Sequence, residues 1–221
     1  MGWYPTGKKL NSNNIYHRYL NLPFEITKPD VLNTKPDKWR HEDINPWICE
    51  HLEAWLNSLG LYSCHTEVFY TPPNHGEIPI HCDDVSVDDR AKINITYGPE
   101  TGTIRWWKSN KVQQVVGKEA GQKLVGKDAL PDDFSERTHH NLVALKEDCE
   151  LVHEVNTNKL SLVNVGQLHS TYNPDPNEGR WTLCFVPASA EIKRREGRRH
   201  LKFEEAVEVF APYIQGDENG N

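Results

Sequence analysis

The chain has 221 residues and carries 25 Lys and Arg against 32 Asp and Glu, which gives a formal net charge of −7 at pH 7. This length suits a single domain with a sizeable core, and the acidic balance disfavours wholesale electrostatic binding to nucleic acid or acidic membranes. We expect a soluble, cytoplasmic protein with reduced thiols, because apolar runs are short, the first residues lack a signal-peptide pattern and the five cysteines follow no paired spacing.

The first 60 residues are predicted to flank the core. Residues 1–44 are polar and rich in proline and asparagine, so we expect an irregular arm with one short strand near 15–20. The Asn-Pro pair at 45–46 begins a predicted helix over 45–60, because Asn caps a helix well and Pro at the first position loses no hydrogen bond. Gly60 can end this helix. Its apolar face, expected to pack on a sheet, comprises Trp47, Ile48, Leu52, Trp55, Leu56 and Leu59.

The predicted core, residues 61–187, opens with a strand pair. Residues 61–71 are aromatic and β-branched and read as a strand, and a proline-rich turn leads to the next strand. Side chains two apart in a strand point to the same face. His81 and Asp83 therefore place an imidazole beside a carboxylate, with Cys82 on the other face.

Two further strands follow. Residues 92–97 alternate cleanly, and their polar face would line a pocket, with Asn94 as a candidate contact for a bound acid. On the strand 103–108, Arg105 and Trp107 share a face and are candidates for substrate binding. Packing within the sheet is the default interpretation for these tandem tryptophans.

A long segment, residues 109–141, interrupts the strand pattern. Its glycines and lysines suggest an insertion between core strands, such as an active-site lid or a substrate loop. His139 and His140 are adjacent and cannot face one metal from a strand, so we do not assign them as ligands. Strands are expected again at 142–145 and 149–155.

The last core strands carry the remaining candidates. Residues 160–165 form a predicted strand that leads to His169. Two histidines and one carboxylate on one face of a metal leave other coordination positions open, as in non-heme Fe(II) oxygenases. On the strand 180–186, Arg180 and Thr182 share a face, and a guanidinium with a nearby hydroxyl suits a carboxylate ligand. Taken alone, Arg180 would be interpreted as part of a surface ion pair.

Residues 188–221 are predicted to be peripheral. The basic run at 193–200 lacks the aromatic residues of a nucleic-acid surface and is expected to be a solvated linker. Apolar residues from Phe203 to Ile214 then recur at helical spacing, which predicts a short amphipathic helix, and the tail after Gly216 is expected to be disordered.

The His-x-Asp at 81–83, the distant His169 and the Arg-x-Thr at 180–182, in this order, resemble the Fe(II)/2-oxoglutarate-dependent dioxygenases over residues 61–185. The resemblance implies a mainly β domain, a double-stranded β-helix (jelly roll), with a supporting N-terminal helix and a short C-terminal helix. It also implies Fe(II) held by His81, Asp83 and His169.

The same resemblance implies the co-substrates 2-oxoglutarate and O2. The far carboxylate of 2-oxoglutarate would lie on Arg180 and Thr182. In several members a tyrosine on the first core strand contacts 2-oxoglutarate, and Tyr70 is the matching residue here. A core or rim tyrosine is the alternative interpretation of Tyr70.

The activity implied is hydroxylation of an unactivated C–H bond, on a peptide or protein side chain or on a small metabolite, with release of succinate and CO2. Prolyl hydroxylases typically have Lys where this chain has Arg180. Nucleic-acid repair members have a second Arg six positions on, where this chain has Val186, which disfavours that substrate class. Two alternatives stay open: a non-catalytic cupin-like binding module, although cupins typically use His-x-His, and a zinc hydrolase, which would need a general base that the sequence does not nominate.

Overall fold

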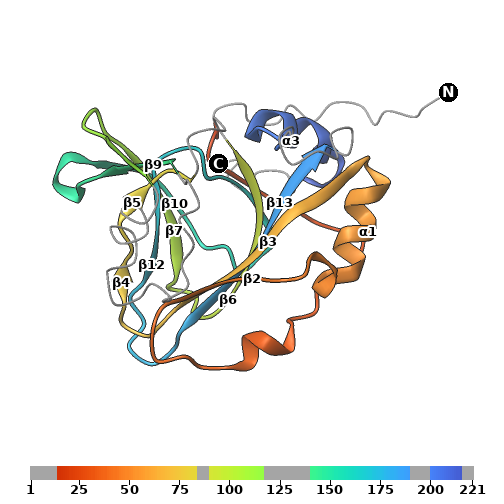
Figure 1. Ribbon diagram of the computed structural model, residues 1–221, viewed down its shortest axis with the longest axis horizontal. Helices are drawn as coiled ribbons and strands as arrows, with labels where there is room; N and C mark the ends of the chain where they lie inside the picture. The colour runs from red at the N-terminus through yellow and green to blue at the C-terminus, as the bar shows by residue number, and fades with distance from the viewer. Residues whose placement is uncertain (1–13, 84–89, 117–139, 190–199, 216–221) are drawn as a thin grey trace.

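The computed structural model describes residues 14–83, 90–116, 140–189 and 200–215. Within these ranges the protein is mainly β, with two antiparallel sheets and two short helices (Figure 1). The six-stranded sheet has the order β1 (His17–Tyr19), β11 (Ser161–Asn164), β6 (Ala91–Tyr97), β13 (Arg180–Ser189), β3 (Leu61–Thr71) and β2 (Arg40–Asp43). The seven-stranded sheet has the order β10 (Glu150–Val155), β7 (Thr103–Lys108), β12 (His169–Asn173), β5 (Ile80–His81), β9 (His140–Ala144) and β8 (Gln113–Val116), with β4 (Gly76–Glu77) pairing β12 beside this path.

The helices α1 (Glu50–Ser58) and α3 (Phe203–Phe210) lie on the outer face of the six-stranded sheet (Figure 1). Short 3-10 turns accompany them at η1 (Asp30–Asn33), η2 (Pro46–Cys49), η4 (Lys146–Asp148) and η5 (Ala211–Tyr213). Odd-numbered side chains of β13 point to this face, where Leu183 and Phe185 are fully buried against the helices. Burial of each such side chain contributes roughly 1.5–3 kcal/mol, so this layer is the main apolar core.

The opposite face of the six-stranded sheet turns toward the seven-stranded sheet and is polar. The register pairs Asn94 with Cys184 and Thr96 with Thr182, so the even-numbered side chains of β6 and β13 share this inner face. Elsewhere between the sheets the contacts are apolar, with Trp106 and Val163 in one buried cluster. A buried polar face requires internal partners or a ligand, and it is therefore where a site is expected.

The predicted N-terminal helix begins differently from expectation. Asn45 does cap it, because its Oδ1 accepts a hydrogen bond from the backbone N–H of Trp47 at 3.0 Å, but the first turn is η2 and α1 begins at Glu50. The tighter 3-10 turn takes Trp47 and Ile48 out of the buried face, and they are 55% and 37% exposed. The expectation that these two residues pack on the sheet is wrong.

The arm before this helix contains more structure than predicted. The short strand expected near 15–20 is β1, but β2 was missed because it consists only of polar residues and has no buried position. Strand β3 has the predicted bounds, and α3 confirms the C-terminal helix. Within the segment 109–141, which was expected to interrupt the strand pattern, the structure has the strand β8 and the start of β9, and these two strands pair with each other. Residues 84–89, 117–139 and 190–199, and with them His139 and most of the basic run, lie outside the described ranges. None of the described helices has the length and apolarity needed to cross a bilayer.

Candidate functional site

The structure brings His81, Asp83 and His169 together between the sheets. His81 ends β5 and His169 begins β12, and the two residues are directly paired across the sheet, with ring centroids 4.6 Å apart. Asp83 follows two residues later, fixed by its backbone N–H, which donates to the carbonyl of Val165 at 2.9 Å. Asp83 Oδ1 lies 3.4 Å from His81 Nε2 and 3.8 Å from His169 Nε2. The predicted ligand set thus converges on one point, while Cys82 packs in a separate apolar cluster.

The backbone fixes the tautomer of both histidines. Nδ1 of His81 lies 2.9 Å from the carbonyl of Pro79, and Nδ1 of His169 lies 2.9 Å from that of Gln167. A carbonyl only accepts, so each Nδ1 carries the proton and each Nε2 presents its lone pair toward Asp83. Metal-binding histidines are oriented by this same kind of outer contact.

Lys92 holds the other side of the carboxylate. Its ammonium lies 2.6 Å from Asp83 Oδ2 and 2.9 Å from Glu67 Oε2; Lys92 and Glu67 are buried, and the Asp83 side chain is 17% exposed. Burial alone would raise the pKa of Asp83, but the Lys92 ammonium outweighs burial and holds the pKa well below its usual range. Glu67 behaves in the same way: Lys92, His41 and His65 overcome burial and lower its pKa. Asp83 is therefore ionised and has its Oδ1 directed at the histidines.

The donor set fits a divalent metal. With bonds of about 2.1 Å, neighbouring ligand atoms are about 3.0 Å apart in an octahedral site and about 3.4 Å apart in a tetrahedral one. The observed 3.4 and 3.8 Å separations lie within about 0.4 Å of the tetrahedral spacing and exceed the octahedral spacing by about 0.4 and 0.8 Å, so the side chains would draw together around an ion. Two imidazoles and one carboxylate suit Fe(II), with positions left for other ligands.

Arg180 is a buried cation on the same inner face. It is 1% exposed and forms no salt bridge with a described residue. Its Nη2 donates weakly to the hydroxyls of Thr157 at 3.2 Å and Thr96 at 3.4 Å, while Nε has no hydrogen-bond partner among the described residues. Burial lowers the pKa of Arg180 to about 10. Such an unpaired charge is costly, and an anion that reaches it would offset that cost.

Thr182 lies beside this guanidinium, with its hydroxyl 3.4 Å from that of Thr96. Thr157, whose hydroxyl lies 2.7 Å from that of Thr96, is the third threonine beside the guanidinium. Its role was not predicted from the sequence, because Thr157 lies in a loop. Gly102 lies against the Arg180 side chain, because a Cβ at this position would come within 2.9 Å of Arg180 Cδ. The glycine leaves room for the arginine side chain to pass.

Asn94 also lies on the inner face. It is buried, and its Oδ1 has no hydrogen-bond partner among the described residues. This placement is compatible with its predicted contact to a bound acid, which stays a prediction.

Tyr70 does not lie where a contact to 2-oxoglutarate would require. It pairs with Trp181, on the face of the sheet opposite to Arg180, and the two rings are 4.8 Å apart in the apolar core. A Cβ at Gly179 would collide with the tyrosine hydroxyl, so Tyr70 packs closely on the residue before Arg180. Its position corresponds to the alternative interpretation, a core tyrosine.

Arg105 and Trp107 lie on the wrong face for substrate binding at the triad. His169 pairs with Trp106, so Trp106 faces inward and its two neighbours face outward. Arg105 Nε contacts Glu154 at 2.8 Å, and its guanidinium stacks on Tyr172 at 3.7 Å. Trp107 donates its indole N–H to Ser170 at 2.8 Å. Both side chains are therefore used in packing the outer face of the seven-stranded sheet.

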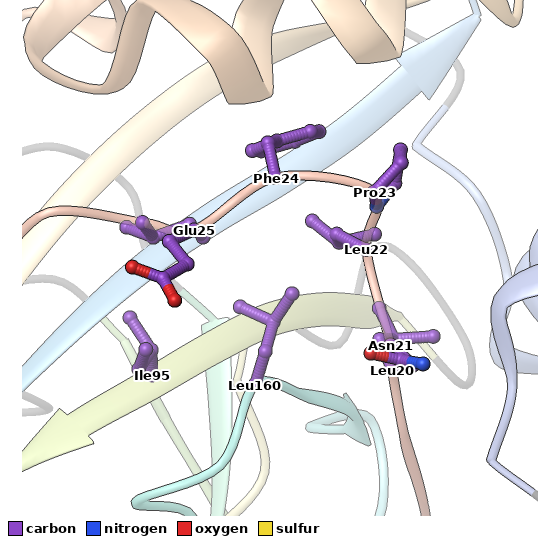
Figure 2. Close-up of a pocket in the computed structure, with 9 residues that line it drawn as sticks. Leu20, Asn21, Leu22, Pro23, Phe24, Glu25, Ile95 and Leu160 are labelled. Carbon is purple, nitrogen blue, oxygen red and sulfur yellow. The ribbon is translucent and has the colours of Figure 1, made fainter.

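A cavity of about 460 Å³ lies elsewhere, under the arm segment 20–26 on the outer face of the six-stranded sheet. Figure 2 shows its lining, with Ile95 and Leu160 below the arm and Glu25 beside them. Glu25 is the one ionisable group among its lining residues. Its lining is mostly apolar side chains of the arm and the sheet, in contrast to the polar groups around the triad and Arg180.

The metal-free protein is expected to lose stability as the pH falls from about 6.5 to about 4. Burial and the neighbouring His81 lower the pKa of His169 from 6.5 to about 4, so the unfolded chain binds a proton more readily than the folded one. With respect to His169, the free energy of unfolding is highest above pH 6.5. Protonation of this residue lowers it by about 3 kcal/mol, since each pKa unit is worth about 1.4 kcal/mol. Urea unfolding across this pH range measures it. His169→Gln should flatten the decline, and an unchanged slope in that variant would contradict the assignment.

No family model matches the sequence, and no curated protein matches it. Among solved structures, the chain is similar to AviO1 from Streptomyces viridochromogenes Tue57, with 17% identity over 80% of this chain and 76% of that chain and a TM-score of 0.38. It is also similar to ycfD from E. coli, with 13% identity over 77% of this chain and 41% of that chain and a TM-score of 0.31. Neither likeness is close enough to carry an argument about activity, which rests on the residues of this chain.

Proposed function

We propose that the protein is an Fe(II)- and 2-oxoglutarate-dependent dioxygenase with a double-stranded β-helix core. One observation carries the proposal: a two-histidine, one-carboxylate cluster and a buried arginine, which has no counter-ion among the described residues, both lie between the sheets. The strand order supports the fold, because the two sheets contain the four-strand series β3-β13-β6-β11 and β5-β12-β7-β10. Along the chain these eight strands change sheet at every step except from β7 to β10, as in a jelly roll.

The roles follow from the contacts. His81, Asp83 and His169 would hold Fe(II), with Lys92 anchoring the carboxylate from behind. Arg180 would pair with the far carboxylate of 2-oxoglutarate, and Thr182 and its neighbouring hydroxyls would add hydrogen bonds. Fe(II), with 2-oxoglutarate and O2, supplies the oxidation of an unactivated C–H bond, and 2-oxoglutarate ends as succinate and CO2.

The chain itself contributes position and exclusion of water. The inner-face side chains Lys92, Asn94 and Thr96 follow one strand, β6, from the carboxylate of the triad to the arginine. A ligand that binds at both ends is thereby held in one orientation, which supplies part of the rate enhancement. The substrate is proposed to be a peptide or protein side chain or a small metabolite.

Anaerobic titration with Fe(II) and then 2-oxoglutarate tests the proposal. The chelated complex is expected to give a visible charge-transfer band that is lost in His81→Ala. His75→Ala is the matched control, because His75 lies exposed in a turn away from the triad. If folded, iron-loaded wild-type protein gives no band, the oxygenase proposal fails and a non-catalytic binding module is favoured.

A further inference from the structure

A second cluster of metal-ligand side chains lies at the edge of the six-stranded sheet. It consists of His41 and Asp43 from β2 and His65 and Glu67 from β3, and we call it the edge cluster. Asp43 is paired directly with Glu67, and residues two apart share a face, so all four side chains emerge on the inner face. They come from two adjacent strands and include none of the triad residues.

The donor atoms of the edge cluster are already close together. His65 Nε2 lies 2.7 Å from Glu67 Oε1 and 3.1 Å from Asp43 Oδ1. His41 Nε2 lies 3.8 Å from the same glutamate oxygen and 3.9 Å from the same aspartate oxygen. The ring nitrogen of His41 and the carboxylate oxygens of Asp43 and Glu67 all lie within 4.8 Å of one another, so modest shifts would bring them to the separation of about 3.4 Å that a tetrahedral zinc ion needs.

The orientation of His41 favours a bound ion over a simple ion-pair network. Its ring stacks on Phe69, with centroids 4.6 Å apart and planes within 10°, so its direction is fixed. Its Nε2 is buried and has no hydrogen-bond partner among the described residues. A nitrogen held in place beside two carboxylate oxygens, yet bonded to neither, has the position of a metal ligand.

The charge balance points the same way. Asp43 and Glu67 bring two carboxylates to the edge cluster, and a divalent cation there would match their charge. Asp43 is 45% exposed, so the site opens to solvent on that side and an ion can enter.

The edge cluster also accounts for a strand that the sequence does not otherwise explain. Strand β2 has no buried residue and lies at the edge of the sheet, where apolar packing does not hold it. We propose that His41, Asp43 and Glu67, with His65 in contact with both carboxylates, bind a second divalent transition-metal ion, of the zinc type, which holds β2 against β3. Because its ligands come from both strands, the ion would have a structural role. The inference is independent of the proposed oxygenase activity.

Zinc stoichiometry on the full chain tests this inference. After chelation and reloading with Zn²⁺ followed by desalting, the wild type is expected to hold about two equivalents. The double variant His41→Ala/His65→Ala should hold one, His81→Ala should also hold one, and His75→Ala should keep two. A wild type with a single equivalent that is lost only with His81→Ala would overturn the inference, as would a double variant that keeps two.

Hydrogen exchange supplies a readout that loss of the triad does not affect. Zn²⁺ should slow exchange of the amides of residues 40–43 in the wild type and in His81→Ala, but not in the double variant. Asp43→Asn, which retains shape and removes the charge, replaces the double variant if that protein does not fold. If Zn²⁺ protects these amides equally in all variants, the edge cluster is not the site.

Discussion

Replacing Lys92 by methionine is expected to lower the free energy of unfolding of the metal-free protein by about 3–5 kcal/mol at pH 7, the range found when one partner of a buried ion pair is removed. The ammonium lies 2.6 Å from Asp83 and 2.9 Å from Glu67, and methionine fills similar space without a charge. Two buried carboxylates would then lack their common counter-ion and would take up protons. Urea unfolding at pH 7 measures the effect.

The pH dependence gives this prediction a sign that can be checked. In the wild type the lowered pKa values of Asp83 and Glu67 contribute stability that is complete above about pH 4.5 and is lost only as the pH falls below their ordinary values. In Lys92→Met burial would raise the pKa of both carboxyls, so protonation removes their uncompensated charges as the pH falls, whereas the wild type loses its ion pairs. The difference in free energy of unfolding between the two proteins should therefore shrink on acidification. Fe(II) should also narrow it, because an ion at the triad compensates Asp83. Lys108→Met, at an exposed position, should change stability by no more than about 0.5 kcal/mol.

If Lys92→Met is as stable as the wild type at pH 7, Lys92 is not the counter-ion of these carboxylates. A deficit that does not depend on pH would instead point to packing as the role of Lys92. The two outcomes are separated by the same unfolding curves, recorded at pH 7 and pH 4.

The sequence contained enough to predict the ligand triad. His81 and Asp83 are spaced for one face of a strand, and His169 recurs in the family's order, so the convergence of the three side chains did not depend on knowing the sheet register. The bounds of β3 were also predictable, because the segment is rich in aromatic and β-branched residues and is followed by the prolines at 72 and 73. The spacing of side chains within a strand and the order of the motifs along the chain are thus sufficient to predict which residues form the triad.

What depends on pairing between distant strands could not be predicted. Tyr70 and Arg180 each belong to a correctly predicted strand, but only the register shows that their side chains point to opposite faces. The same holds for Arg105. Its strand, β7, alternates as expected, but only the pairing of β7 with β12 shows which of the two faces of β7 points inward. Glu67 lies within a strand that reads as apolar, so its contact with Lys92 has no signal in the sequence.

Lys92 and Arg180 form a natural comparison, because both are buried cations on one face but only Lys92 has carboxylate partners. Replacing Arg180 by methionine is therefore expected to change stability in the opposite direction. Removal of a charge with no counter-ion among the described residues should leave the ligand-free protein unchanged or more stable, by up to about 4 kcal/mol. Arg105→Met is the matched control, since it breaks ion pairs with Glu154 and Glu77 and should lower stability.

The cost of Arg180→Met should appear in binding. Loss of a buried charge pair costs about 2–5 kcal/mol, so affinity for 2-oxoglutarate should fall by roughly 30-fold to several-thousand-fold, while Fe(II) still binds at the triad. Thermal unfolding with and without 2-oxoglutarate measures both the stability of the ligand-free protein and the effect of the ligand. A ligand at 100 times its Kd adds about 2.7 kcal/mol to the free energy of unfolding of the wild type. A variant that is less stable when ligand-free and is still stabilised by 2-oxoglutarate would show that Arg180 is a structural residue. A more stable variant that no longer responds to 2-oxoglutarate would mean that the fold bears the cost of an unpaired charge in order to bind an acid.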